Sequence, residues 1–145
     1  MAHPLAGKPA PEDVLIDVES LRAKYFDERP DPKVEAERVT FGTSGHRGSA
    51  ARRSFNEAHI LAVTQAVVEH RKAQGIHGPL FVGMDSHALS APAHETCLSV
   101  LAAHAVDARI AKGSALTPTP LVSHAIISWN RDASAAIDID DSHTW

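Results

Sequence analysis

Residues 41–48 read Phe-Gly-Thr-Ser-Gly-His-Arg-Gly, and this stretch governs the interpretation of the whole chain. Its three glycines allow a sharp turn and a close approach between the backbone and a ligand. Thr43 and Ser44 add hydroxyl groups, and Arg47 adds a planar set of donors suited to a phosphate. The stretch therefore predicts an anion-binding loop. An ordinary glycine-rich hairpin with a solvated arginine is the alternative.

Outward from this loop, helical and strand-like segments alternate. A short apolar strand at 39–41 leads into the loop. Asn56 can cap a helix that Gly75 ends, and Thr117 can cap another beside Pro118. Such alternation predicts an α/β fold with a largely parallel sheet, whose ligands bind at the carboxyl ends of the strands. The expected helices are 56–74, one from residue 90, and one from residue 117; the further strands are 79–83, 107–111 and 135–139.

The buried faces of these helices follow from their apolar spacing. For the first helix we expect Ile60, Leu61, Ala62, Val67 and Val68 to be buried, and for the last Val122, Ile126 and Ile127.

The first 38 residues are predicted to form an arm. Prolines keep its start extended, and apolar residues recur at helical spacing over 12–26. The segment 29–32 (Arg-Pro-Asp-Pro) ends this helix, and 33–38 is a charged linker. We expect the arm helix to pack on the main domain or on another subunit.

Composition excludes several classes of protein. Apolar residues make up 43% and charged residues 22% of the chain, as in ordinary globular proteins. The net charge of −4 gives no reason to expect a nucleic-acid partner. Cys97 is the only cysteine, so a disulfide framework is excluded, and we expect a small buried side chain rather than a reactive thiol. No apolar run is long enough to cross a membrane and no signal-peptide pattern is present, so a cytoplasmic location is expected.

The loop at 41–48 resembles the first signature of the α-D-phosphohexomutases, and specifically of their bacterial phosphoglucomutase branch. The resemblance continues in order along the chain and covers nearly all of residues 6–130. Its further segments are 49–52 (Ser-Ala-Ala-Arg), 54–57 (Ser-Phe-Asn-Glu), 59–61 (His-Ile-Leu), 82–83 with Asp85, 87–90 (His-Ala-Leu-Ser) and 117–120 (Thr-Pro-Thr-Pro).

This resemblance implies a three-layer α/β/α domain with a mainly parallel mixed sheet at residues 39–145, preceded by the arm at 1–38. Family enzymes have four domains, and this chain is similar only to the first. We therefore expect the metal-binding loop, the sugar-selecting loop and the distal phosphate site to be absent. The family interconverts glucose 1-phosphate and glucose 6-phosphate through a phosphoserine, with Mg²⁺ and glucose 1,6-bisphosphate as cofactors.

The resemblance also assigns residues to the site. Ser142 and His143 would be catalytic, and Ser142 would ligate the metal through its phosphate once phosphorylated. The residues implied to bind the phosphate or the sugar phosphate substrate are Thr43, Ser44, Gly45, His46, Arg47 and His87.

The tail departs from the family pattern, which is Thr-Pro-Ser-His-Asn-Pro. Here residues 139–145 read Ile-Asp-Asp-Ser-His-Thr-Trp. Asp138, Asp140 and Asp141 would repel a phosphoserine, which carries about −1.5 to −2 charges. We therefore expect this chain alone to be inactive and to bind no cofactor productively. A polar tail is the alternative for Ser142 and His143. For the whole chain, the alternative is a non-catalytic domain that binds phosphate or a partner.

The second loop differs from the family as well. Residues 82–87 read Val-Gly-Met-Asp-Ser-His where the bacterial branch has Val-Gly-Lys-Asp-Thr-His, so Met84 removes a positive charge. His87 could donate to an anion when protonated, or serve as a capping or surface residue. The chain has ten histidines but no zinc-type pair. His143 with Asp138 and Asp140 is a weak cation candidate.

Association is the last expectation from the sequence. A first domain without its neighbours should leave apolar side chains uncovered, and exposed apolar patches commonly mark interfaces. We expect the chain either to self-associate through such a patch or to be only marginally stable alone. Its candidate residues are Leu116, Leu121, Trp129 and Trp145.

Overall fold

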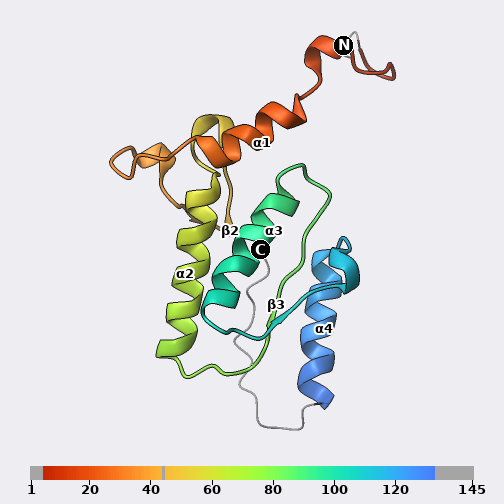
Figure 1. The fold of residues 1–145 in the computed structure, drawn as a ribbon. Coiled ribbons are helices and arrows are strands. Elements are labelled where there is room, and N and C mark those ends of the chain that lie inside the picture. Colours follow the sequence, from red (N-terminus) through yellow and green to blue (C-terminus); the bar gives the residue numbers. More distant parts are fainter. Residues whose placement is uncertain (1–4, 44, 133–145) are drawn as a thin grey trace.

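The computed structural model describes residues 5–43 and 45–132, and within them the chain forms three layers (Figure 1). Helices α2 (Glu57–Ala73) and α3 (Ser90–Ala103) pack side by side and form one layer. The parallel pair β3 (Leu80–Phe81) and β4 (Ala108–Arg109) forms the second, and α4 (Thr119–Asp132) the third. The α/β/α class predicted from the sequence is confirmed. The predicted strand at 135–139 lies outside the described residues.

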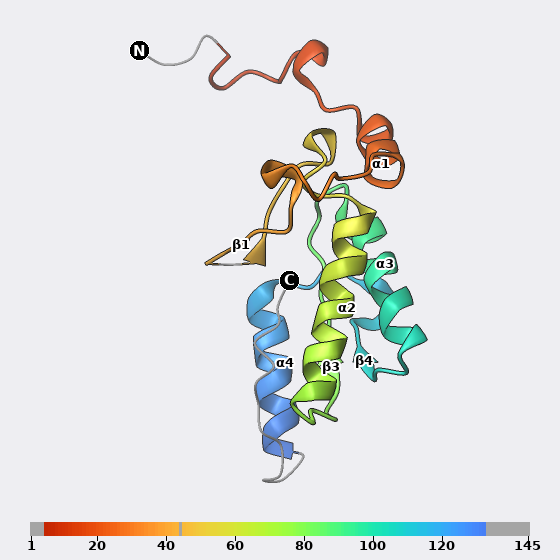
Figure 2. The same ribbon diagram turned by 90° about the vertical axis from the view of Figure 1, so that its left-hand side faces the viewer.

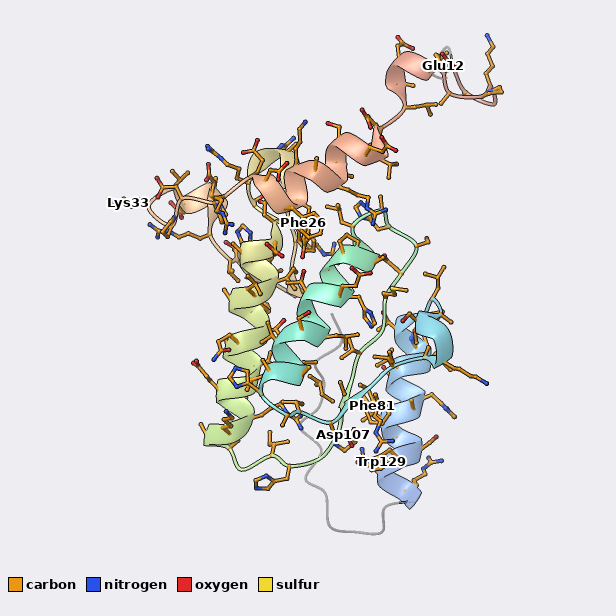
Figure 3. All side chains as sticks on the ribbon, in the orientation of Figure 1. Glu12, Phe26, Lys33, Phe81, Asp107 and Trp129 are labelled. Atoms are coloured by element: carbon orange, nitrogen blue, oxygen red, sulfur yellow. The ribbon has the colours of Figure 1, made fainter. Side chains whose placement is uncertain are left out.

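The strand β3 is covered on both faces, because successive side chains of a strand point to opposite sides. Leu80 and Val82 pack toward α2 and α3. Phe81 faces α4, where its ring lies 6.3 Å from that of Trp129 (Figure 3). Beside this strand, Leu80 N–H donates to Asp107 O at 2.8 Å, which sets the parallel register.

Apolar burial holds this part of the molecule together. We call the cluster between α2, α3 and β3 the sheet core. It includes the only cysteine of the chain, which is buried as expected. Its members are Val68, Leu80, Val82, Cys97 and Leu101.

The glycine-rich stretch does not join the parallel pair. Strands β1 (Phe41–Gly42) and β2 (Gly45–His46) form a separate antiparallel hairpin, in which Phe41 pairs with His46. The predicted strand at 39–41 was therefore placed in the wrong sheet, and the hairpin alternative describes the backbone. The φ of Gly45 is 102°, a conformation that residues with a side chain rarely adopt.

The N-terminal arm packs on the domain, which is one of its two expected positions. Its helix is shorter than predicted: a 3₁₀ turn at Glu12–Val14 precedes α1 (Val18–Asp27). Asp17 ends the extended stretch between them, because its carboxylate caps α1 by accepting from Ser20 N–H at 3.0 Å. Figure 1 shows α1 crossing the upper end of the domain, and Figure 2 shows residues 5–17 before it extending away.

Tyr25 is the anchor of the arm. Its side chain is fully buried, and its hydroxyl donates to Thr96 Oγ1 at 3.0 Å. Tyr25 packs in a second buried cluster, which we call the arm core. Its members are Tyr25, Ala50 and Leu89. The buried Asn56, which precedes α2, adds polar ties, since its Nδ2 donates to Lys24 O at 2.8 Å and to Ala50 O at 3.2 Å.

Some predicted inner faces were wrong. Leu61 is 39% exposed and Ile127 is 50% exposed, because the buried stripes of α2 and α4 run through other residues. Ala62 is exposed for the same reason. Thr117 does not cap α4, since its hydroxyl donates to Ala115 O at 2.9 Å and the helix begins at Thr119.

Further 3₁₀ turns lie on either side of the glycine-rich hairpin, at Glu35–Glu37 and Ala50–Arg52. Another, at Lys112–Ser114, precedes α4. Among the described residues, no helix combines the length and the apolar character needed to cross a bilayer.

Candidate phosphate-binding site

A cleft of about 840 Å³ opens where the hairpin, the end of β3 and the start of α4 meet. Arg47 and Gly48 line it after β2, and Asp85 and His87 line it after β3. Thr117 belongs to it as well, because its N–H donates to Met84 O at 2.8 Å. Three loops, at 45–49, 83–90 and 117–119, therefore share one cleft. The segment 140–145, which would follow the predicted last strand, lies outside the described residues.

Among the described residues, Arg47 is the arginine that lines this cleft. Its side chain is exposed, and no acidic group within the described ranges pairs with it. An arginine without a partner can offer its fork of N–H groups to a phosphate in a bidentate contact. Its position therefore suits an anion that enters from solvent.

Gly48 follows Arg47 and lies against the chain that leads into α2. A Cβ atom built there would be 2.0 Å from Ser54 O, a distance that real contacts do not allow. Ser49 N–H also donates to Ser54 Oγ at 3.0 Å, which closes this turn. A glycine is therefore required here for close packing of the backbone, and this packing fixes where Arg47 leaves the hairpin.

The loop after β3 orients His87. Its Nδ1 accepts from Leu89 N–H at 3.1 Å, so Nε2 carries the ring proton in the neutral form. The neutral ring can therefore donate its Nε2–H to an anion. We had expected donation only from the protonated, charged ring. Capping of the backbone and anion binding, which we treated as alternatives, are compatible here.

Asp85 supports the same loop. Its Oδ1 accepts from the Ser90 hydroxyl and, at 2.9 Å, from His87 N–H. These bonds, with Ser90 first and the His87 backbone second, lower the pKa of Asp85 below its ordinary value. The carboxylate keeps its negative charge, so an anion bound by Arg47 and His87 would have to overcome its repulsion.

The wall of the cleft below these groups is mostly apolar and comes from both helical layers. It includes Val82, Leu89 and Val122. His94 is buried in this wall, and burial lowers its pKa. Burial also raises the pKa of the Cys97 thiol, as expected for a buried cysteine rather than a reactive one.

The residues implied by the resemblance are placed as follows. Arg47, Gly45 and His87 line the cleft, and Thr43 is exposed in the hairpin turn. His46 also lines it, but its ring packs inward on Phe55, at 5.9 Å between centroids. Ser44, Ser142 and His143 lie outside the described residues.

Sequence reasoning missed Glu37, which we assigned to a charged linker. It is only 6% exposed, and its Oε1 lies 2.7 Å from Arg53 Nη2. A glutamate within a run of charged residues is usually solvated, so no sequence signal marked this one.

The implied Mg²⁺ and the weak cation candidate both require a cluster of metal ligands. Nowhere in residues 5–43 and 45–132 do three or more His, Cys, Asp or Glu side chains gather as metal ligands. These residues therefore do not fit a metal ion. His143, Asp138 and Asp140 lie outside them.

Two members of the predicted apolar patch are exposed. Leu116 is 57% exposed and Leu121 is 54% exposed. Trp129 is half-buried, and the guanidinium of Arg109 lies 5.0 Å from the centre of its ring. Trp145 lies outside the described residues, and self-association remains a prediction.

Fold and site together define an α/β/α domain that presents a glycine-rich, arginine-bearing loop beside the ends of its parallel strands. Residues 38–144 match the family described as phosphoglucomutase/phosphomannomutase, alpha/beta/alpha domain I, and the chain belongs to that family. A phosphoglucomutase from Komagataeibacter xylinus is 51% identical over 132 residues. These residues are 91% of this chain but only 24% of that protein.

Proposed function

We propose that this chain supplies the first phosphate-binding site of a phosphohexomutase. In this proposal Arg47 contacts two oxygens of a phosphate, and His87 donates its Nε2–H to the same group. The observation that supports it is that one cleft holds a histidine of defined tautomer and an exposed arginine with which no acidic group of the described residues pairs. The anion would be the phosphate of a sugar phosphate, as the phosphoglucomutase relative suggests.

Ser142 and His143 remain our candidates for the catalytic pair of that reaction, and a phosphorylated Ser142 would be the metal ligand. Phosphoryl transfer requires cations and donors that neutralise the developing charge. Within the described residues, Arg47 is the group suited to that task. We propose that residues 39–145 form the phosphohexomutase-like first domain, that residues 1–38 are its arm, and that the chain alone does not interconvert glucose 1-phosphate and glucose 6-phosphate.

Phosphate affinity tests the proposal. Charge-assisted hydrogen bonds contribute about 1.5–3 kcal/mol each, so two such contacts should give a dissociation constant in the millimolar range. The ³¹P line width of inorganic phosphate, titrated with protein, would measure it. Arg47→Ala should abolish the broadening. Arg52→Ala, which removes an exposed arginine that does not line the cleft, is the matched control. Equal affinity in both variants would contradict the assignment.

The alternative function is a domain that binds phosphate or a partner without turnover. Both functions require the same loop, so binding alone does not separate them. A coupled assay with glucose 1-phosphate, glucose 1,6-bisphosphate and Mg²⁺ does. We expect no turnover by this chain. Turnover that persists through purification and is lost in Ser142→Ala would show that the chain is itself a mutase.

A further inference from the structure

His59, the third residue of α2, is fixed in one orientation at the junction of the arm and the hairpin. It is 3% exposed. Its Nδ1 accepts from Asn56 N–H at 3.1 Å, so its Nε2 carries the proton and donates to Glu37 O at 2.8 Å. Two hydrogen bonds on opposite sides of an imidazole leave the ring little freedom to rotate.

The fixed ring of His59 stacks on His46. The two centroids are 5.2 Å apart and the rings are inclined by 20°. His46 is the residue directly before Arg47, and its Nδ1 lies 3.2 Å from both the N and the O of Thr40. Aromatic contacts of this kind restrict orientation as well as position. The direction in which Arg47 leaves the hairpin therefore depends on the His59 ring, which stacks on His46.

Glu37 anchors the other side of His59. Its Oε2 accepts from Asp31 N–H at 2.8 Å, and its Oε1 pairs with Arg53. A buried carboxylate bonded on both oxygens holds its own backbone in place, and the carbonyl of that backbone is the acceptor for His59. A continuous series of contacts thus runs from the arm through His59 and His46 to the anion loop.

We propose that His59 is a positioning residue for the phosphate site. It acts through the His46 ring and sets the orientation from which Arg47 meets the anion. Glu37 holds His59, which makes the segment before the hairpin part of the site. This inference rests on the proposed function, because it assigns a role in phosphate binding to a residue that does not contact the phosphate.

Two substitutions separate the ring of His59 from its hydrogen bonds. His59→Gln keeps a donor for Glu37 O and an acceptor for Asn56 N–H, since glutamine at this position of a helix forms a capping box. This variant removes the ring that stacks on His46. His59→Phe keeps a ring but removes both hydrogen bonds. The matched control is His77→Gln, which makes the same chemical change at an exposed position after α2.

The proposal expects binding and stability to respond differently. His59→Gln should weaken phosphate binding by about threefold to tenfold with little change in melting temperature. His59→Phe should lower the melting temperature but change the phosphate affinity by less than about twofold. A merely structural role would reduce both quantities together in both variants. Phosphate affinity in His59→Gln equal to that of His77→Gln would overturn the proposal.

A second measurement keeps the inference separate from the proposed function. If the wild-type chain bound no phosphate, the proposed function would fail. The ¹⁵N relaxation of the amides of Gly45, Arg47 and Gly48 in the free protein would then decide the positioning role. Increased fast motion at these amides in His59→Gln, and not in His77→Gln, supports it. Unchanged motion overturns it.

Discussion

The sheet core and the arm core are both buried, but they are held by different interactions. The sheet core is a cluster of apolar side chains between two helices and a strand. The arm core is surrounded by polar contacts: Tyr25 bonds to Thr96, Asn56 ties Lys24 to Ala50, and His59 joins Glu37 to the hairpin. One region depends mainly on the area that it removes from water, and the other also depends on hydrogen bonds of fixed direction.

This difference separates stability from positioning. Burial of apolar surface is not directional, so it stabilises a fold without fixing the angle of a side chain. Hydrogen bonds weaken steeply when their geometry is disturbed, so a bonded network defines orientation. The glycine-rich hairpin, where we propose that the anion binds, lies beside the arm core, where the directional contacts are. Variants in the sheet core should therefore change stability, and variants around the arm core should change the site.

The largest expected effect is in the sheet core. Leu101 is fully buried, so Leu101→Ala should lower the free energy of unfolding by about 2–5 kcal/mol through lost burial and a residual cavity. Leu121→Ala on the exposed side of α4 is the control and should change it by less than about 0.5 kcal/mol. Urea denaturation measures both. Phosphate affinity of the folded Leu101→Ala fraction should equal that of the wild type; a parallel loss would show that the two regions are not separable.

Gly48→Ala is the sharpest change at the loop. The added methyl group would meet Ser54 O, and relieving that overlap should cost about 1–3 kcal/mol and displace Arg47. The control is Gly42→Ala, because the described residues place only Gly45 O, at 3.9 Å, within 4 Å of a Cβ at Gly42. We expect Gly48→Ala to lose measurable phosphate binding and Gly42→Ala to retain it. Retained phosphate binding in Gly48→Ala would show that this close packing is not needed to position Arg47.

Tyr25→Phe tests the polar part of the arm core and should cost about 1 kcal/mol. Burial, the main cause, raises the pKa of Tyr25 to about 12, whereas its ordinary value is 10.0. A raised folded-state pKa means that this contribution is complete below pH 10 and is lost as the pH rises toward 12. Tyr25 is the only tyrosine, so tyrosinate absorbance reports it alone. The phenylalanine variant should lack this alkaline loss of stability; the same loss in both proteins would assign it to another group.

The smallest effect compares two helix ends. Gly75 follows α2 with a φ of 66°, and Ala105 follows α3 with a φ of 54°. Both ends have the same hydrogen bonds, with Ile76 N–H donating to Arg71 O and Val106 N–H to Leu101 O. Alanine is strained in this conformation, so Ala105→Gly should stabilise the chain by about 0.5–1 kcal/mol and Gly75→Ala should destabilise it by a similar amount. Thermal unfolding measures both, and shifts of the same sign would contradict the shared geometry.

These helix ends also show how far the sequence alone could lead. Gly75 was predicted as a helix end because glycine favours this conformation, whereas nothing in the sequence marks Ala105. The apolar strand around Leu80 was predicted because both of its faces are buried. The separate hairpin at residues 41–46 was considered only as the alternative, since glycine-rich strands carry little pattern.

Within the site, the sequence predicted Arg47 and the glycines, because their chemistry is local. It did not predict Glu37 or the role of His59. Each depends on partners brought together by folding: Arg53 for the first, and Asn56, Glu37 and His46 for the second. The tautomer of His87 also depends on one backbone contact, with Leu89. Polar networks of this kind have no periodicity that a sequence pattern could report.

We expect the anion to bind at the loop of residues 41–48, beside the arm core. A map of backbone amide shifts on addition of inorganic phosphate tests it most directly. We expect shifts that saturate in the millimolar range and are centred on residues 45–48 and 85–90, with none at Val68, Leu80 and Leu101, the members of the sheet core that do not line the cleft. Shifts spread evenly along the chain, or centred on the sheet core, would contradict the account.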